Sequence, residues 1–234
     1  MTELLRVANL NAFYGESHVL HGIDLHVGRR EVVTLLGRNG SGRSTTLKAI
    51  LGLVPRRTGS VMMNGRETIG MQPHRITRLG GVGYCPEERG IFASLTAEEN
   101  LTLLPKLGPG GMSLEEIYAM FPNLLERRKS PGMRLSGGEQ QMLALARILR
   151  VGARILLLDE ITEGLAPVIV KTLGKVVRGL GERGLTMILV EQNFRFVSQL
   201  ADRNYLIEHG RIVDMIAKNE VGSRMEELHR FLGV

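Results

Sequence analysis

Short apolar runs separated by glycine turns fill the first 36 residues of the chain. The runs are residues 4–7, 18–20, 23–27 and 32–36. Apolar and polar positions alternate within them, a period of two that is typical of strands with one buried face. Turns at Gly15, Gly22 and Gly28 bound these runs. The sequence therefore predicts a layer of antiparallel strands before residue 37.

The middle of the chain is predicted to be mostly helical. Two strands precede it, one at residues 58–65 that ends in an Asn-Gly turn and one at residues 81–85. Thr96 is followed three positions later by Glu99, which is the pattern of a capping box at a helix start, and Ser113 opens a second helix by the same signal. We expect residues 96–150 to form a helical subdomain inserted between strands of a main sheet.

A longer helix is predicted after residue 139. Its apolar residues recur at helical spacing, so one face should be buried. These residues are Met142, Leu143, Ala146 and Leu149.

Residues 154–160 form a continuous apolar run that ends in two acids. Such a run is typical of a central parallel strand that is covered on both faces. The patterns that follow predict a helix at 168–180, a strand at 185–190, a helix at 194–200, a hairpin at 205–213 and a helix at 220–231. Alternating strands and helices predict an α/β fold whose ligands bind beyond the carboxyl ends of the strands.

Composition and length fit one soluble globular domain. The 234 residues are 43% hydrophobic and 23% charged, and a core of this size needs no disulfide or metal. The single cysteine, Cys85, cannot form an internal disulfide, which favours a reducing compartment and a small buried side chain. No apolar run is long enough to cross a bilayer, and no secretory signal opens the chain.

The net charge of +6 raises the possibility of a nucleic-acid partner. However, the basic clusters are short, aromatic residues are not interleaved with them, and the chain has no tryptophan on which bases could stack. We therefore expect no nucleic acid, and we favour a basic surface near anionic lipid headgroups. The six histidines show no metal-binding spacing.

A glycine-rich segment between a predicted strand and a predicted helix is the clearest chemical signal. The phosphate-binding loop pattern requires glycine, four residues, Gly-Lys, and then serine or threonine. This chain matches the pattern except that Arg43 stands in the place of lysine. Converging backbone N–H groups and the helix N-terminus would bind a phosphate here. The candidate binding residues are Gly37, Asn39, Gly40, Ser41, Gly42, Arg43, Ser44 and Thr45.

The two acids at the end of the apolar run narrow the function. Asp159 at a strand end can hold Mg²⁺ together with the hydroxyl of Ser44. Glu160 would then polarise the water that attacks the γ-phosphorus of a nucleotide. An acidic pair at a helix start is a common alternative, but the nearby phosphate loop favours the catalytic interpretation.

A second helix-terminal anion site is predicted at residues 135–141, Leu-Ser-Gly-Gly-Glu-Gln-Gln. Two such sites make sense if two chains dimerise head to tail, so that each helix end covers the nucleotide of its partner. This heptapeptide resembles the signature of the ATP-binding cassette (ABC) ATPases, and the order of motifs along the chain is that of the family. The residues concerned are Ser136, Gly137, Gly138, Glu139 and Gln140.

The resemblance implies ATP and Mg²⁺ as cofactors and further site residues. Tyr14 stands where the family stacks an aromatic ring on adenine, although an ordinary strand-edge tyrosine is the alternative. Glu87 replaces a glutamine that usually contacts Mg²⁺, and Gln192 replaces the switch histidine near the γ-phosphate. Ile161 and Pro167 replace a proline and an aspartate of the family pattern.

Most of these departures resemble one branch, the ATPase subunits of branched-chain amino-acid importers. The segments that carry this resemblance are residues 86–87, 163–167 and 190–193. The resemblance implies a peripheral ATPase on the cytoplasmic face of the inner membrane, docked on transmembrane permease subunits and paired with a second ATP-binding subunit, identical or different. A periplasmic solute-binding protein would act indirectly. The ATPase subunit of a urea or short-amide importer is an alternative that these motifs do not exclude.

Arg43 and Ile161 depart even from that branch. The planar guanidinium of arginine is larger than the ammonium of lysine, and phosphoryl transfer depends on positioning. We expect nucleotide binding with lowered hydrolysis, and a smaller effect from Ile161. One rival is a regulatory subunit that binds nucleotide and hydrolyses little. A second is a soluble ABC ATPase that acts on DNA or ribosomes, but this chain lacks the coiled-coil insertion or second cassette usual there.

Overall fold

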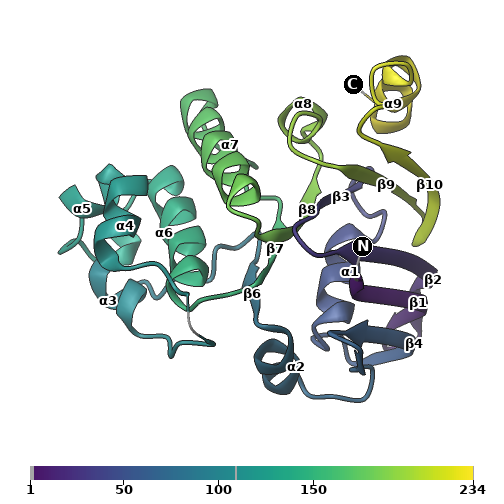
Figure 1. The fold of residues 1–234 in the computed structure, drawn as a ribbon, viewed down its shortest axis with the longest axis horizontal. Coiled ribbons are helices and arrows are strands. Elements are labelled where there is room, and N and C mark those ends of the chain that lie inside the picture. Colours follow the sequence, from purple (N-terminus) through teal and green to yellow (C-terminus); the bar gives the residue numbers. More distant parts are fainter. Residues whose placement is uncertain (1–2, 109, 234) are drawn as a thin grey trace.

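The strands of the molecule form two β-sheets, and the sheet that contains β1, β2 and β4 lies at one side, next to α1 (Figure 1). In the computed structural model, which describes residues 3–108 and 110–233, the first sheet is antiparallel with the strand order β2-β1-β4-β5. Its strands are β1 (Glu3–Tyr14), β2 (Ser17–Gly28), β4 (Arg56–Met63) and β5 (Arg66–Glu67). Asn64 and Gly65, both at positive φ, form the predicted turn between β4 and β5. The predicted antiparallel layer is therefore present.

Two details of that layer were predicted wrongly. Gly22 is not a turn: it lies inside β2 at φ 79°, where the pairing register with β1 shifts. An extra residue in a left-handed conformation is accommodated as a β-bulge, so the strand continues through the glycine. The run at residues 32–36 is strand β3 (Val32–Leu36), and it belongs to the other sheet.

The second sheet has six strands in the order β10-β9-β3-β8-β7-β6. Its remaining strands are β6 (Val82–Cys85), β7 (Ile155–Asp159), β8 (Thr186–Glu191), β9 (Arg203–Glu208) and β10 (Arg211–Ala217). All neighbours are parallel except β10, which returns antiparallel to β9 through the predicted hairpin. Every residue of β3, β7 and β8 is buried, as expected for strands covered on both faces, and Cys85 is buried as predicted.

Helices cover both faces of this sheet. They are α1 (Arg43–Ile50), α2 (Pro73–Gly80), α3 (Ala97–Thr102), α4 (Leu114–Met120), α5 (Pro122–Glu126), α6 (Gly137–Arg150), α7 (Pro167–Glu182), α8 (Phe194–Val197) and α9 (Met225–Leu232), with a 3₁₀ turn at Gly132–Arg134. Capping boxes at Thr96 and Ser113 are confirmed. Helix α2 was not predicted, α8 ends at Val197 rather than at residue 200, and α9 begins at Met225 rather than at residue 220. Across the described residues, no helix is both long and apolar enough to cross a membrane.

The core is divided by the six-stranded sheet into two layers. Val33 and Leu35 of β3 face one layer, which they share with α1 and the antiparallel sheet, whereas Leu36 faces the layer of α6 to α9. Successive strand residues point to opposite faces, so one strand supplies both layers. Helix α6 is buried on more than the one face we predicted, because it lies between β6 and helices α3 to α5.

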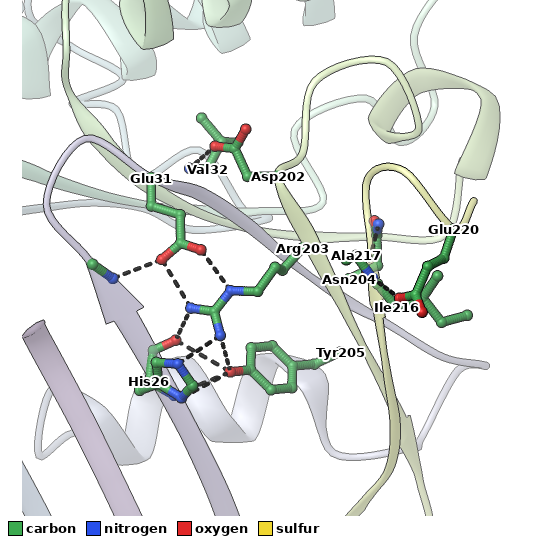
Figure 2. A network of polar contacts seen from close by, with 11 residues as sticks. His26, Glu31, Val32, Asp202, Arg203, Asn204, Tyr205, Ile216, Ala217 and Glu220 are labelled. Atoms are coloured by element: carbon green, nitrogen blue, oxygen red, sulfur yellow. Dashed lines mark hydrogen bonds and ion pairs between the residues drawn. The ribbon is translucent and has the colours of Figure 1, made fainter. Parts of the chain in front are cut away.

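A network of polar contacts fixes the amino-terminal edge of the six-stranded sheet (Figure 2). Glu31, just before β3, accepts hydrogen bonds from Nε of Arg203 at 2.5 Å and from its Nη2 at 2.8 Å. Asp202 accepts a hydrogen bond from the N–H of Val32 at 3.0 Å. These contacts hold β3 beside β9, and the glycine-rich loop follows at the opposite end of β3.

Candidate active site

The glycine-rich loop joins the carboxyl end of β3 to the start of α1. Gly42, the N-cap of α1, has φ 107°, a conformation that side chains rarely adopt. A Cβ atom on Gly37 would lie 2.3 Å from the carbonyl oxygen of Ile207 in β9. Glycine is therefore required at both positions, at one by the backbone turn and at the other by close packing. The predicted strand, loop and helix are all present.

A cavity of about 350 Å³ lies over this loop. Two buried polar atoms of the loop, Oγ of Ser41 and Nη1 of Arg43, have no hydrogen-bond partner among the described residues. Buried donors are normally satisfied, so unsatisfied ones beside a helix N-terminus fit an anionic ligand such as a phosphate. The cavity is lined by Val19, Asn39, Gly40, Ser41, Gly42, Arg43, Ser44, Thr45, Glu87, Glu160 and Glu163.

Arg43 is 4% exposed and is turned toward the acids of the site. Its Nη2 donates to Oε1 of Glu160 at 2.7 Å and to Oδ1 of Asn39 at 3.0 Å. Burial lowers the pKa of Arg43, and the surrounding acids only partly oppose this. Burial and the neighbouring Glu163 raise the pKa of Glu160, although the charge of Arg43 acts against them. The unusual cation of the loop therefore pairs with the predicted catalytic base.

The backbone of Glu160 is also unusual. Its φ of 48° lies in the left-handed region, which costs energy for a residue other than glycine. The N–H of Glu160 donates to the carbonyl oxygen of Val190 at 2.9 Å, so a hydrogen bond to β8 holds this conformation. Strained backbone of this kind tends to occur at functional sites.

Asp159 and Ser44 meet as the sequence predicted. Asp159, at the end of β7, is 1% exposed and accepts a hydrogen bond from Oγ of Ser44 at 2.8 Å. The hydroxyl of Tyr84 donates to the other carboxylate oxygen at 3.0 Å. Burial raises the pKa of Asp159, and the two hydrogen bonds oppose that rise. Sequence reasoning missed Tyr84, which pairs with Leu157 in the adjacent strand and could have been found from that strand neighbourhood.

Oxygen ligands gather beside this pair. The carboxylates of Glu87, Glu160 and Glu163 each place an oxygen within 4.8 Å of the others. Burial raises the pKa of Glu87, and the neighbouring acids raise it further. Carboxylate and hydroxyl oxygens are the protein ligands that Mg²⁺ prefers, so the donor set that includes Ser44 and Asp159 fits this ion. Glu163 was not among the predicted ligands.

Gln192 lies beside the loop and the acids, and its predicted contact with the γ-phosphate stays a prediction. Its Nε2 donates to Oδ1 of Asn39 at 2.5 Å and to Oε2 of Glu160 at 3.3 Å. Both carboxylate oxygens of Glu160 are therefore engaged, one by Arg43 and the other by Gln192. This side-chain network joins the phosphate loop to the ends of β7 and β8.

The segment after Glu160 is tied to β8 by a buried acid that sequence reasoning missed. Glu191 is 2% exposed and accepts hydrogen bonds from Oγ1 of Thr162 at 2.8 Å and from its backbone N–H at 3.2 Å. Burial raises the pKa of Glu191 to about 7. Ile161, in the place of the family's proline, is buried in the core layer of α6 to α9.

The signature residues form the start of α6. The hydroxyl of Ser136 accepts a hydrogen bond from the N–H of Glu139 at 3.3 Å, and the carboxylate of Glu139 accepts one from the N–H of Ser136 at 2.8 Å. Gly137 and Gly138 form the first turn between them. This reciprocal capping box satisfies two backbone N–H groups at the start of the helix.

The signature and the phosphate loop do not meet within one chain. Gln140 is held by Arg89, which donates to its Oε1 at 3.0 Å. Among the described residues, those that line the cavity over the loop do not include any of residues 136–140. Figure 1 shows α6 beside α3 to α5, on the other side of the molecule from α1.

Tyr14 ends β1 and pairs with Ser17 across the hairpin. Its side chain is 39% exposed, and it does not line the cavity over the loop. An exposed ring offers a free face for stacking, and its predicted contact with adenine stays a prediction.

Comparisons with known proteins agree on one family. The family profile "ABC transporter" matches residues 20–163. The chain is 37% identical to the high-affinity branched-chain amino acid transport ATP-binding protein BraG of Pseudomonas aeruginosa, over 90% of this chain and 91% of that protein. It is 36% identical to the probable branched-chain amino acid transport ATP-binding protein LivF of Archaeoglobus fulgidus, over 93% and 94%.

A solved structure of an ATP-binding subunit of an ABC transporter has the same fold. It superposes with a TM-score of 0.80 at 25% identity, covering 99% of this chain and all of that one. The motifs, the fold and these relatives lead to one conclusion. The chain belongs to the ABC transporter family and is an ABC ATPase homologous to the ATP-binding subunits of branched-chain amino-acid importers.

Proposed function

We propose that this chain supplies the energy of ATP to an importer of branched-chain or related amino acids. One observation carries the proposal: the phosphate loop and Glu160 line the same cavity, in a chain that is 37% identical over 90% of its length to a transport ATP-binding protein. Residues 1–234 would act as one ATP-binding domain, with residues 96–150 as its helical subdomain.

The predicted site residues would divide the work as follows. Tyr14 would stack on adenine, and the loop at residues 37–45 would bind the phosphates through its N–H groups and Arg43. Glu160 would accept a proton from the attacking water, and Gln192 would contact the γ-phosphate. Residues 136–140 would complete the site of a partner chain.

Ser44, Asp159 and Glu87 would hold Mg²⁺, because their oxygens suit a hard divalent cation. When bound, the ion would neutralise charge on the phosphates of the nucleotide. The hydroxyl of Tyr84 orients the Asp159 carboxylate toward this role.

The separation of the two anion sites supports a head-to-tail pair of ATP-binding subunits. We place that pair, identical or mixed, on transmembrane permeases at the cytoplasmic face of the inner membrane, with a periplasmic solute-binding protein delivering the solute. Reconstituting the chain with its co-purifying permease in vesicles tests this. We expect ATP-dependent leucine uptake that Glu160→Gln abolishes while ATP binding remains. ATP-dependent uptake of urea or a short amide without leucine would assign the chain to the sibling class.

A second candidate is a nucleotide-binding subunit with little hydrolysis of its own. The ion pair between Arg43 and Glu160 favours it, because the base is neutralised while the loop cation is engaged by that base inside the cavity. Bound phosphates would have to draw Arg43 away before Glu160 could act as a base. Such a subunit would work beside a competent partner.

Arg43→Lys separates the two candidates. Lysine presents a compact ammonium rather than a planar fork, so it would reach the phosphates with less contact to Glu160. We expect phosphate release by the purified dimer to rise roughly tenfold, about 1.4 kcal/mol in the barrier. Arg43→Met, which removes the charge, is the matched control, and its rate of phosphate release should not rise. An unchanged rate in Arg43→Lys would show that Arg43 does not limit hydrolysis.

A further inference from the structure

Arg38 lies near the start of the phosphate loop, directly after Gly37. Residues 39–45 line the cavity over the loop, and Arg38 does not. Its exposed side chain instead borders a second cavity of about 330 Å³, which Phe231 also lines. The guanidinium crosses this gap: Nε donates to the carbonyl oxygen of Phe231 at 3.1 Å, and Nη2 donates to that of Arg230 at 3.4 Å.

These two carbonyl groups belong to the last turn of α9. The last four carbonyls of an α-helix have no partner within the helix, and a cation near them is favoured by the helix dipole. Gly233, at φ 77°, closes the helix by donating from its N–H to the carbonyl oxygen of His229 at 2.9 Å. The forked guanidinium of Arg38 is suited to reach two adjacent carbonyls, which an ammonium would do less well.

Helix α9 also packs against the segment that follows Gln192. The rings of His229 and Phe194 meet edge to face, with their centroids 6.1 Å apart. Leu228 is fully buried in the same core layer as Phe194 and Val197 of α8. Figure 1 shows α9 beside α8 near the carboxyl terminus. The helix therefore contacts two segments of the candidate site, the phosphate loop and the chain that follows Gln192.

We propose that α9 is a brace for the nucleotide site and that Arg38 is the positioning residue that links them. With α9 docked, Arg38 holds the first turn of the loop in the shape that binds phosphates. Coupling of this kind is reciprocal, so nucleotide binding must stabilise the docked α9 by the same factor. Anything that displaces residues 225–233 would lower nucleotide affinity. This inference goes beyond the proposed function, because it concerns binding and not hydrolysis or the transported solute.

The test uses the full-length chain with ADP as the probe, so that hydrolysis plays no part. Arg38→Gln removes the charge and the fork, Arg38→Lys restores the charge without the fork, and Arg66→Gln is a matched control at an exposed arginine in β5. Hydrogen exchange of residues 225–232 is measured with and without ADP, together with the dissociation constant for ADP.

In the unmodified chain and in Arg66→Gln, we expect ADP to slow exchange in α9 several-fold. Arg38→Gln should bind ADP roughly three- to tenfold more weakly, exchange faster in α9 without nucleotide, and lose the effect of ADP on α9. Arg38→Lys should recover part of both. A mere folding defect would not separate the lysine from the glutamine variant in this way.

The proposal would be wrong if ADP left the hydrogen exchange of α9 unchanged in the unmodified chain. It would also be wrong if Arg38→Gln bound ADP as tightly as the unmodified chain does. If the unmodified chain neither hydrolysed ATP nor supported transport in a separate assay, the proposed function would be contradicted. The ADP affinity and the hydrogen exchange of α9 would still test the role of Arg38.

Discussion

Two ion pairs between arginine and glutamate lie at opposite ends of the six-stranded sheet, and they differ in how fully they are satisfied. At the amino-terminal edge, Arg203 binds both carboxylate oxygens of Glu31 through two nitrogens. Its remaining donors reach the hydroxyl of Tyr205 at 3.1 Å and the carbonyl oxygen of His26 at 2.9 Å, as Figure 2 shows. This pair has the bidentate geometry of a strong structural contact.

At the carboxyl edge, Arg43 meets Glu160 through a single nitrogen, and its Nη1 is buried without a partner among the described residues. The pKa shifts of the four residues also distinguish the two ion pairs. Hydrogen bonds to Glu31 raise the pKa of Arg203, whereas burial lowers the pKa of Arg43. Burial pushes the pKa of Glu31 up, but the hydrogen bonds it accepts lower it overall, and the pKa of Glu160 stays raised.

The two ion pairs therefore have different roles. The Arg203 pair stabilises both charged forms and so contributes to folding. The Arg43 pair leaves a buried cation under-satisfied, which a ligand with several negative oxygens would relieve. An ion pair beside a cavity can therefore favour the binding of an anionic ligand while it contributes little to the stability of the fold.

Breaking the satisfied pair should have the largest effect on stability. Arg203→Met leaves the carboxylate of Glu31 largely buried without its partner, so we expect the free energy of unfolding to fall by about 3 kcal/mol. Urea denaturation followed by circular dichroism measures it. Arg75→Met, at an exposed position in α2, is the control and should change little. A loss no larger than that of the control would mean that the Arg203 pair contributes nothing.

The buried acids around Arg43 predict that the free energy of unfolding depends on pH. The effect should be smaller than that of Arg203→Met and larger than that of Arg43→Met. The folded-state pKa of Glu191 is about 7 and lies above its ordinary value, so the folded chain binds this proton more tightly than the unfolded chain. The free energy of unfolding should therefore fall by roughly 1–3 kcal/mol as pH rises from about 5 to about 8. Denaturation across this range should show the fall in the unmodified chain.

Glu191→Gln provides the control for that prediction, because glutamine does not titrate. Its stability should fall less steeply than that of the unmodified chain over the same pH range, because the remaining fall comes only from Glu87, Asp159 and Glu160, whose pKa values are also raised. Glu31 acts in the opposite direction: its lowered pKa contributes stability that is lost only as pH falls through the folded-state value. Equal slopes for the unmodified chain and Glu191→Gln would exclude Glu191 as the source.

Removing the unsatisfied cation should have the smallest effect on stability. Arg43→Met loses two hydrogen bonds but also removes the cost of burying a charge. Glu160 keeps its hydrogen bond from Gln192 and, with its raised pKa, takes up a proton more readily than Glu31 does, so we expect a change below about 1 kcal/mol in either direction. The same variant should bind ADP at least roughly tenfold more weakly, because the loop loses its cation. Isothermal calorimetry and urea denaturation on one preparation report both quantities. A loss of stability equal to that in Arg203→Met would erase the contrast between the pairs.

Much of the fold was predictable because its signals are local. Capping boxes at Thr96 and Ser113, the turn at Asn64 and the buried run at β7 depend on residues a few positions apart, and all were confirmed. The assignment of β3 to the antiparallel layer was wrong, because a short apolar run does not reveal which strands will pair with it. Gly22 was misread for a similar reason, since a bulge and a turn both favour glycine.

Local sequence patterns were enough to predict the chemical parts of this protein: the phosphate loop, the strand-end acids and the signature helix. Their identities follow from residue types at fixed spacing, because backbone geometry translates spacing directly into a local shape. Which of these side chains contact one another became known from the folded chain. Arg43 pairs with Glu160 across 117 positions of the chain, and Arg38 reaches the end of α9 across more than 190. Contacts between segments so far apart depend on how whole layers pack, and no local pattern encodes that packing.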